Sequence, residues 1–247
     1  GNETGMANLD TFQGIGTITR AENGRPFPFF YGFKTNGIFQ NESEVTSYVN
    51  KEGKPIMPNA KPGDVRFVDV NGDGQITDAD RYIYKQAAPP VTMGLSSRLE
   101  YKNWDFGFSF RANIGNYVYN DKYADRSNMN PAEIVSPSNY LSNRPRALLS
   151  DNWQTYDERA LLSDRWIQNA SFLKLDNVTL GYSFSKLFNT SISGRIYGTA
   201  SNLLTITKYD GIDPEVTNFV DGKWVMGIDN NVYPRPMSFI LGVNLNF

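Results

Sequence analysis

The stretch "WDFGFSFRANI", residues 104–114, carries the strongest structural signal in the chain. Its side chains alternate strictly between an apolar row and a polar row. The apolar row consists of Trp104, Phe106, Phe108, Phe110, Ala112 and Ile114. The polar row consists of Asp105, Gly107, Ser109, Arg111 and Asn113. Successive side chains of a strand point to opposite faces, so this pattern over about ten residues predicts a strand that crosses a membrane in a β-barrel.

The preceding stretch, "TMGLSSRLEYK" at 92–102, alternates in the same way. One of its faces carries Met93, Leu95, Ser97, Leu99 and Tyr101. Lys102 and Asn103 leave room only for a tight link, so the two stretches predict a β-hairpin.

Further segments extend the pattern. "SFLKLDNVTLGYSFS" (171–185) and "TSISGRIYGTASN" (190–202) predict a second hairpin with a short link around 186–189. "MSFILGVNLNF" (237–247) predicts the last strand, and "FFYGFKTNGIF" (29–39) predicts a sixth.

The links between these strands alternate between short turns and long stretches, which cover about 40–91, 115–170 and 203–237. Short periplasmic turns and long extracellular loops are typical of outer-membrane barrels. The predicted fold class is therefore all-β: an antiparallel transmembrane β-barrel segment with long extracellular loops. Six strands are fewer than the eight of the smallest single-chain barrel, so we expect the C-terminal piece of a larger barrel or one chain of a split barrel.

Composition restricts the function. The 247 residues include no cysteine and no histidine, which excludes disulfides, Ser-His triads and the commonest transition-metal ligand. A net charge of −2 without a long basic run gives no reason to expect nucleic acid as a partner. Carboxylate chemistry remains open, but nothing in the sequence places two acidic groups across a cleft, so we expect no enzyme.

The opening "GNETGMANLDTFQG" lacks the features of a signal peptide, so either a signal was removed or the chain begins inside a longer protein.

The segment "DVNGDGQITDAD", residues 69–80, matches a twelve-residue calcium loop. The predicted Ca²⁺ ligands are Asp69, Asn71, Asp73, Gln75, Thr77 and Asp80, with Gly74 at the sharp turn. Hard oxygen ligands at these intervals suit Ca²⁺. Asp80 stands where a glutamate is usual, which shortens the last arm. The alternative is an Asx-rich turn held by its own side chains.

Several stretches together resemble the C-terminal quarter of SusC-type TonB-dependent outer-membrane transporters. They are "FPFFYGFKTNGIFQNESEV", "KPGDVRFVDVNGDGQITDADR", "WIQNASFLKLDNVTLGYSF", "YGTASNLLTIT" and "YPRPMSFILGVNLNF". The resemblance implies about six strands of a roughly 22-stranded barrel around a plug that is absent here. It also implies import of oligosaccharides or peptides across the outer membrane. The implied partners are the remaining barrel and plug, a SusD-type surface lipoprotein, TonB and outer-membrane lipid.

Two further sets of residues are candidates for function. The resemblance implies that the alternating C-terminal residues are the signal read by barrel-assembly machinery: Phe239, Leu241, Val243, Leu245 and Phe247. The alternative is that they only form a lipid-facing edge strand. Substrate contact is a second possibility for polar-row charges and loop aromatics: Arg98, Glu100, Asp105, Arg111, Trp153, Tyr156, Trp166, Tyr209 and Trp224. The alternatives are wall ion pairs for the charges and packing or an interfacial girdle for the aromatics.

Two rival interpretations remain: a soluble all-β calcium-binding module for carbohydrate binding or adhesion, and a carboxylate-based hydrolase. The apolar row of 104–114 discriminates against the first, because its aromatic side chains suit lipid whereas a soluble sandwich would bury them.

Overall fold

The computed structural model describes residues 18–20, 24–127, 158–185, 191–220, 223–230 and 232–246. The chain divides into two compact units. The sheet unit comprises 89–116, 169–215 and 232–247. The mixed unit comprises 1–88, 117–168 and 216–231.

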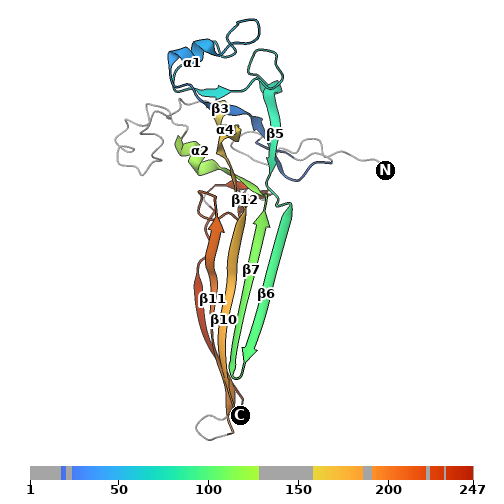
Figure 1. The fold of residues 1–247 in the computed structure, drawn as a ribbon, viewed down its shortest axis with the longest axis vertical. Coiled ribbons are helices and arrows are strands. Elements are labelled where there is room, and N and C mark those ends of the chain that lie inside the picture. The colour runs from blue at the N-terminus through green and yellow to red at the C-terminus, as the bar shows by residue number, and fades with distance from the viewer. Residues whose placement is uncertain are drawn as a thin grey trace, which may run out of the picture. The chain divides into compact units, whose positions relative to one another are not determined.

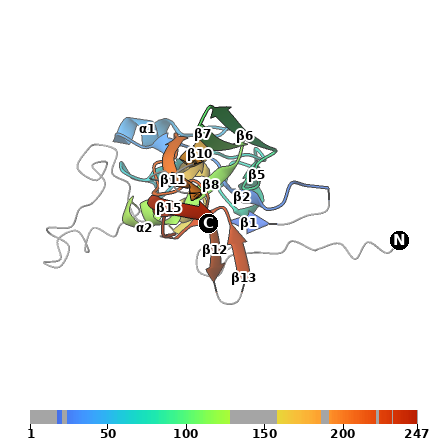
Figure 2. The same cartoon turned by 90° about the horizontal axis from the view of Figure 1, so that it is seen from below.

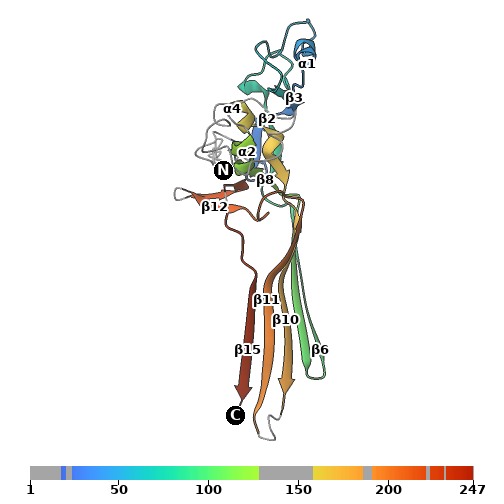
Figure 3. The same ribbon diagram turned by 90° about the vertical axis from the view of Figure 1, so that its left-hand side faces the viewer.

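The sheet unit is built on five long strands in the order β15-β11-β10-β7-β6, which lie side by side in Figures 1 and 3. Their bounds are β6 (Val91–Tyr101), β7 (Trp104–Ile114), β10 (Phe172–Phe184), β11 (Ser193–Thr207) and β15 (Ser238–Asn246). Each strand is antiparallel to its neighbours, and the strands follow one another in chain order. The predicted all-β antiparallel class is confirmed.

The register aligns the apolar residues of all five strands on one face. Leu180 of β10 lies opposite Phe106 of β7 on one side and Gly198 of β11 on the other. Leu95 and Leu241 on this face are 60% and 88% exposed. A continuous exposed apolar face of this kind is a contact surface for lipid or protein rather than for water.

The predicted turn at Lys102 and Asn103 is confirmed, because Tyr101 pairs with Trp104 across it. Lys102 adopts a φ of 53°, as a tight two-residue hairpin requires. In β10, the register shifts between Leu175 and Asn177, so Asp176 forms a bulge. No helix among the described residues is long and apolar enough to cross a membrane.

The other strands are short: β1 (Thr19–Arg20), β2 (Phe29–Phe33), β3 (Thr35–Ile38), β4 (Val65–Phe67), β5 (Arg81–Gln86), β8 (Tyr117–Asn120), β9 (Ile167–Asn169), β12 (Thr217–Val220), β13 (Lys223–Met226) and β14 (Ile228–Asp229). They pair as β1-β2-β5, β14-β8-β9, β3-β4 and β12-β13. Figure 2 shows the β12-β13 hairpin. The helices are α1 (Glu42–Ser47), α2 (Asp121–Ser127), α4 (Glu158–Leu161) and the 3-10 helices η1 (Asp78–Asp80) and η3 (Asp164–Trp166).

The prediction of a sixth long strand over 29–39 is wrong. That segment is divided into β2, which pairs with β1 and β5, and β3, which pairs with β4. Both faces of β2 are occupied, since Phe29, Phe30 and Phe33 are all at most 3% exposed. The aromatic residues here fill the core of the mixed unit instead of facing lipid.

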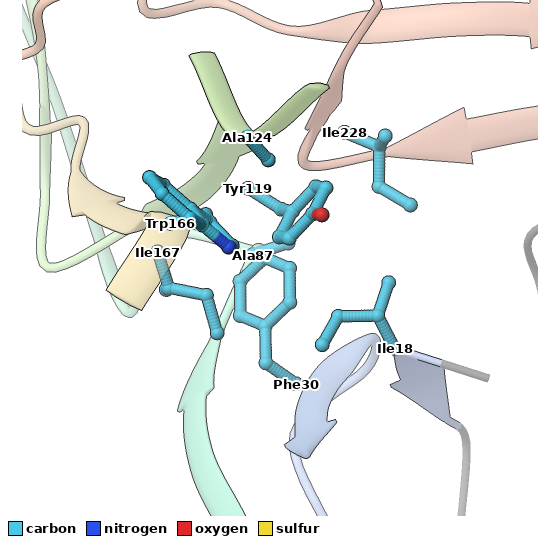
Figure 4. Close-up of a cluster of buried hydrophobic side chains, with 8 residues drawn as sticks. All are labelled: Ile18, Phe30, Ala87, Tyr119, Ala124, Trp166, Ile167 and Ile228. Carbon is cyan, nitrogen blue, oxygen red and sulfur yellow. The ribbon is translucent and has the colours of Figure 1, made fainter. Parts of the chain in front are cut away.

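A cluster of buried hydrophobic side chains forms that core (Figure 4). It consists of Ile18, Phe30, Ala87, Tyr119, Ala124, Trp166, Ile167 and Ile228. These residues come from segments far apart in sequence, which shows that the predicted long loops fold around a hydrophobic core of their own. A second cluster holds Phe33, Val65, Phe67 and Ala160.

Candidate functional site: an acidic loop and the ion pairs of the sheet

The loop after β4 and the 3-10 helix η1 that follows it bring three carboxylates together. Oxygen atoms of Asp69, Asp73 and Asp80 all lie within 4.8 Å of one another. Asp80 is fully buried, whereas Asp73 is exposed. The predicted spacing therefore does produce a cluster of hard oxygen atoms.

Backbone N–H groups hold the deepest carboxylate in place. Asp80 accepts hydrogen bonds from the amides of Val70 (2.9 Å) and Thr77 (2.7 Å). The Thr77 hydroxyl in turn accepts from the Ala79 amide at 3.3 Å and caps η1. Thr77 and Asp80 thus form a reciprocal capping box that orients the end of the loop.

Asp69 anchors the start of the loop by accepting from the amides of Gly72 and Gly74, both at 2.7 Å. Gly74 has a φ of +83°, which a glycine adopts without steric cost. The Asn71 side chain is engaged inside the loop, because its amide donates to Asp73 at 3.0 Å.

These residues fit a hard divalent cation. Each carboxylate oxygen has two lone-pair directions, so an oxygen that accepts one N–H bond can still ligate an ion. Three negative charges held this close repel one another, and a bound cation would remove that repulsion. The same hydrogen bonds also satisfy the Asx-turn alternative.

A second polar cluster lies on the polar face of the sheet unit. Lys174 of β10 donates to Asp213 at 2.8 Å and to Glu215 at 2.7 Å. Arg111 of β7 bonds both Asp176 and Glu215, with its Nε 2.9 Å from Asp176. Arg235 lies 3.5 Å from Glu215. Lys174 and Arg111 therefore fasten the segment after β11 to the sheet through Asp213 and Glu215. Together with Asp176 and Arg235, these residues are called the Lys174 cluster.

The charges of the Lys174 cluster are strongly coupled. Burial by itself would raise the pKa of Glu215, but hydrogen bonds from Arg111 and Lys174 outweigh it and lower that pKa to about 2. The Lys174 side chain is only 6% exposed. Water therefore screens these pairs far less than pairs at an open surface.

A third set of charges lies near the β6-β7 turn. Asp105 of β7 accepts from Arg195 of β11 at 2.8 Å and 2.5 Å. The pair reaches across β10 at Gly181, where any Cβ would collide with both side chains. Arg98 lies 3.1 Å from Glu100 and 3.8 Å from Asp105. Ion pairs thus connect the side chains of the polar row. For Arg98, Glu100, Asp105 and Arg111, this agrees with the alternative in which the charges form ion pairs in the barrel wall instead of contacting substrate.

The aromatic candidates have different positions. Trp166 is 1% exposed and its indole N–H donates to the Ala160 carbonyl at 2.7 Å, so it packs in the mixed-unit core. Tyr209 is 5% exposed. Trp153 and Tyr156 lie outside the described residues, and Trp224 belongs to β13 with its side chain outside them. For Trp166, burial leaves no surface for a substrate to stack on, and packing replaces the predicted contact.

The C-terminal residues Phe239, Leu241, Val243 and Leu245 lie on the apolar face of β15, opposite Ala200, Gly198, Ile196 and Gly194. Phe247 lies outside the described residues. Their role as an assembly signal stays a prediction.

Sequence reasoning missed Lys174, Arg195, Asp213 and Glu215. The signal for Lys174 was a charge in the polar row of 171–185, where a long cation needs a partner. Nothing local pointed to Asp213 and Glu215, which lie 39 and 41 residues further along the chain.

The chain is similar in sequence to known TonB-dependent receptors. The TonB-dependent receptor SusC of Bacteroides thetaiotaomicron is 44% identical over 193 residues, which covers 76% of this chain and 18% of the receptor. The chain belongs to the family of SusC-type TonB-dependent receptors. The TonB-dependent receptor P3 of Formosa agariphila is 29% identical over 231 residues, 88% of this chain and 22% of that receptor. No family model matches the chain.

Solved structures agree on the fold of this SusC-type segment. A chain of the RagAB peptide importer in its open-open state superposes with a TM-score of 0.64. It is 23% identical and covers 97% of this chain and 24% of its own length. The SusC-type chain therefore spans about a fifth to a quarter of the proteins it matches. These relatives are named as receptors or importers.

Proposed function

We propose that this chain forms the C-terminal wall of an outer-membrane transporter that imports oligosaccharides or peptides with energy delivered through TonB. The observation that carries the proposal is the five-stranded antiparallel sheet, with one exposed apolar face and one ion-paired polar face. A wall between lipid and a water-filled or plugged lumen needs these two faces. A soluble adhesion module would bury the apolar face.

The partners in this proposal are the remaining barrel and plug, a SusD-type surface lipoprotein, TonB and the substrate. Similarity to SusC and to the chain of the RagAB importer supports them. The two relatives leave both substrate classes open. RagAB is named as a peptide importer, whereas the name of the TonB-dependent receptor SusC specifies no substrate.

Cell fractionation tests the proposal. The full-length protein is expected in the outer-membrane fraction, and it should migrate faster on gels before boiling than after, because a closed barrel resists detergent. Deleting its gene should abolish growth on one class of oligosaccharide or peptide as sole nutrient, and TonB depletion should have the same effect. A soluble protein unaffected by boiling would refute the transporter and favour the calcium-binding module.

We also propose that the acidic loop binds a structural Ca²⁺ through Asp69, Asp73 and Asp80, with Asn71, Gln75 and Thr77 completing the shell. The close carboxylates and the sharp turn at Gly74 support this assignment. The ion would brace the loop and takes no part in transport itself.

Replacing Asp69 and Asp73 by Asn tests the calcium site, because each amide oxygen can still accept one of the two hydrogen bonds that the carboxylate accepts, while two charges are lost. We expect Ca²⁺ to slow proteolysis of the unchanged loop at least tenfold and to have little effect on the double variant. The control is Asp78→Asn, which removes a carboxylate that is not one of the proposed ligands. Equal protection by Ca²⁺ in the double variant would contradict the site.

A further inference from the structure

The apolar face of the sheet unit is interrupted by a groove. A cavity of about 320 Å³ opens on it, and its lining includes Trp104, Leu180, Tyr182, Ile196, Gly198 and Leu241. Four neighbouring strands contribute, so the groove runs from β7 across β10 and β11 to the edge strand β15.

A glycine creates the floor of the groove. Gly198 lies opposite Leu180 on one side and Leu241 on the other. A Cβ at this position would meet only Leu241, at 3.4 Å, an ordinary van der Waals contact. The missing side chain is therefore not required by packing, and the space above it is available to a ligand.

One end of the groove carries two aromatic rings, and a cation lies in the β6-β7 turn that precedes Trp104. The Trp104 and Tyr182 rings lie 4.9 Å apart. Trp104 pairs across the turn with Tyr101, and the Lys102 ammonium lies 5.3 Å from the Tyr101 ring. Tryptophan and tyrosine gather at the level of lipid head groups, where lysine meets phosphate.

We propose that this groove binds one acyl chain of an anionic glycerophospholipid, with Lys102 contacting the phosphate of its head group. The inference rests on the proposed outer-membrane location, in which the short β6-β7 turn faces the periplasm and its phospholipid leaflet.

Two physical effects would recognise different parts of the phospholipid: dispersion contacts recognise the acyl chain, and charge recognises the head group. Lipid tails are as apolar as leucine, so the groove gains dispersion contacts rather than hydrophobic driving force. Those contacts select an acyl chain at this place but do not distinguish one phospholipid from another. The charge of Lys102 supplies that distinction, and its ammonium lies 5.3 Å from the Tyr101 ring.

The test uses the full-length transporter, delipidated in mild detergent and titrated with phosphatidylglycerol or phosphatidylethanolamine of matched chains. Native mass spectrometry counts the lipids retained per protein. Gly198→Leu fills the groove, and Ser97→Leu adds the same bulk to the apolar face of β6 as a matched control. Lys102→Asn removes the charge while keeping a residue that tolerates positive φ.

We expect Gly198→Leu to retain one phospholipid fewer than both the unchanged protein and Ser97→Leu. Lys102→Asn should weaken retention of phosphatidylglycerol about fivefold, with a smaller effect on phosphatidylethanolamine. Equal lipid counts in Gly198→Leu and Ser97→Leu would overturn the groove as a lipid site. If the barrels still shift on boiling, that failure leaves the transporter proposal intact, whereas a protein absent from the outer membrane would overturn both.

Discussion

Replacing Lys174 with Met is expected to destabilise the folded protein by about 3–5 kcal/mol, the cost of removing one partner from a buried ion pair. Lys174 holds Asp213 and Glu215 together, and its side chain is 6% exposed. Methionine preserves most of the volume, so the loss reflects the charge. The measurement is the midpoint of chemical unfolding of the full-length protein in detergent micelles.

Lys208→Met serves as the matched control, since Lys208 follows β11 directly and is exposed. It should change the free energy of unfolding by no more than about 0.5 kcal/mol. Adding Asp213→Asn to Lys174→Met should recover part of the loss by removing the uncompensated anion. Equal midpoints for Lys174→Met and Lys208→Met would show that the Lys174 cluster does not hold the sheet unit together.

The same cluster sets a pH dependence. Glu215 has its pKa lowered from 4.5 to about 2, so its contribution is present above pH 4.5 and is lost as the pH falls towards 2. Lys174→Met removes one of the two hydrogen-bond donors that lower this pKa. We therefore expect the variant to lose the Glu215 contribution at a higher pH than the unchanged protein.

Replacing Gly32 with Ala should have the largest effect in the mixed unit. A Cβ on Gly32 would overlap the carbonyl oxygen of Leu162, which accepts a 2.8 Å hydrogen bond from the Phe33 amide. A backbone carbonyl cannot rotate away as a side chain can, so β2 and the segment around Leu162 must move apart. We expect a cost of about 3 kcal/mol, the upper part of the usual range for overpacking.

Amide hydrogen exchange is the measurement for this variant. Phe33 should exchange about a hundredfold faster, because local opening replaces a protected hydrogen bond. Gly94→Ala is the control, since a Cβ there meets nothing within 4 Å. Unchanged protection at Phe33 would mean that β2 moves to accommodate the methyl group without losing its contact.

Local sequence determined the five long strands and, except at the β10 bulge at Asp176, the face that each side chain occupies. Strand alternation has a period of two and needs no knowledge of distant residues, which is why "WDFGFSFRANI" was sufficient for β7. The same local logic placed the three carboxylates of the acidic loop, because their partners are amides at most ten residues away.

The pattern failed at 29–39 for a physical reason. Buried aromatics in a small core and lipid-facing aromatics in a barrel look alike in sequence, since both are large and apolar. Only the packing of Phe30 against residues such as Tyr119 and Trp166 separates the two cases.

The sequence by itself thus determined the two-faced strands, their turns and the acidic loop. The tertiary structure alone decided which charges meet and where the apolar face is hollow. The pairing of Lys174 with Asp213 and Glu215, the reach of Arg195 over Gly181 and the groove above Gly198 all depend on the register between strands. Register is set by the sum of many cross-strand contacts, and a shift of one residue would turn every side chain of a strand to the other face.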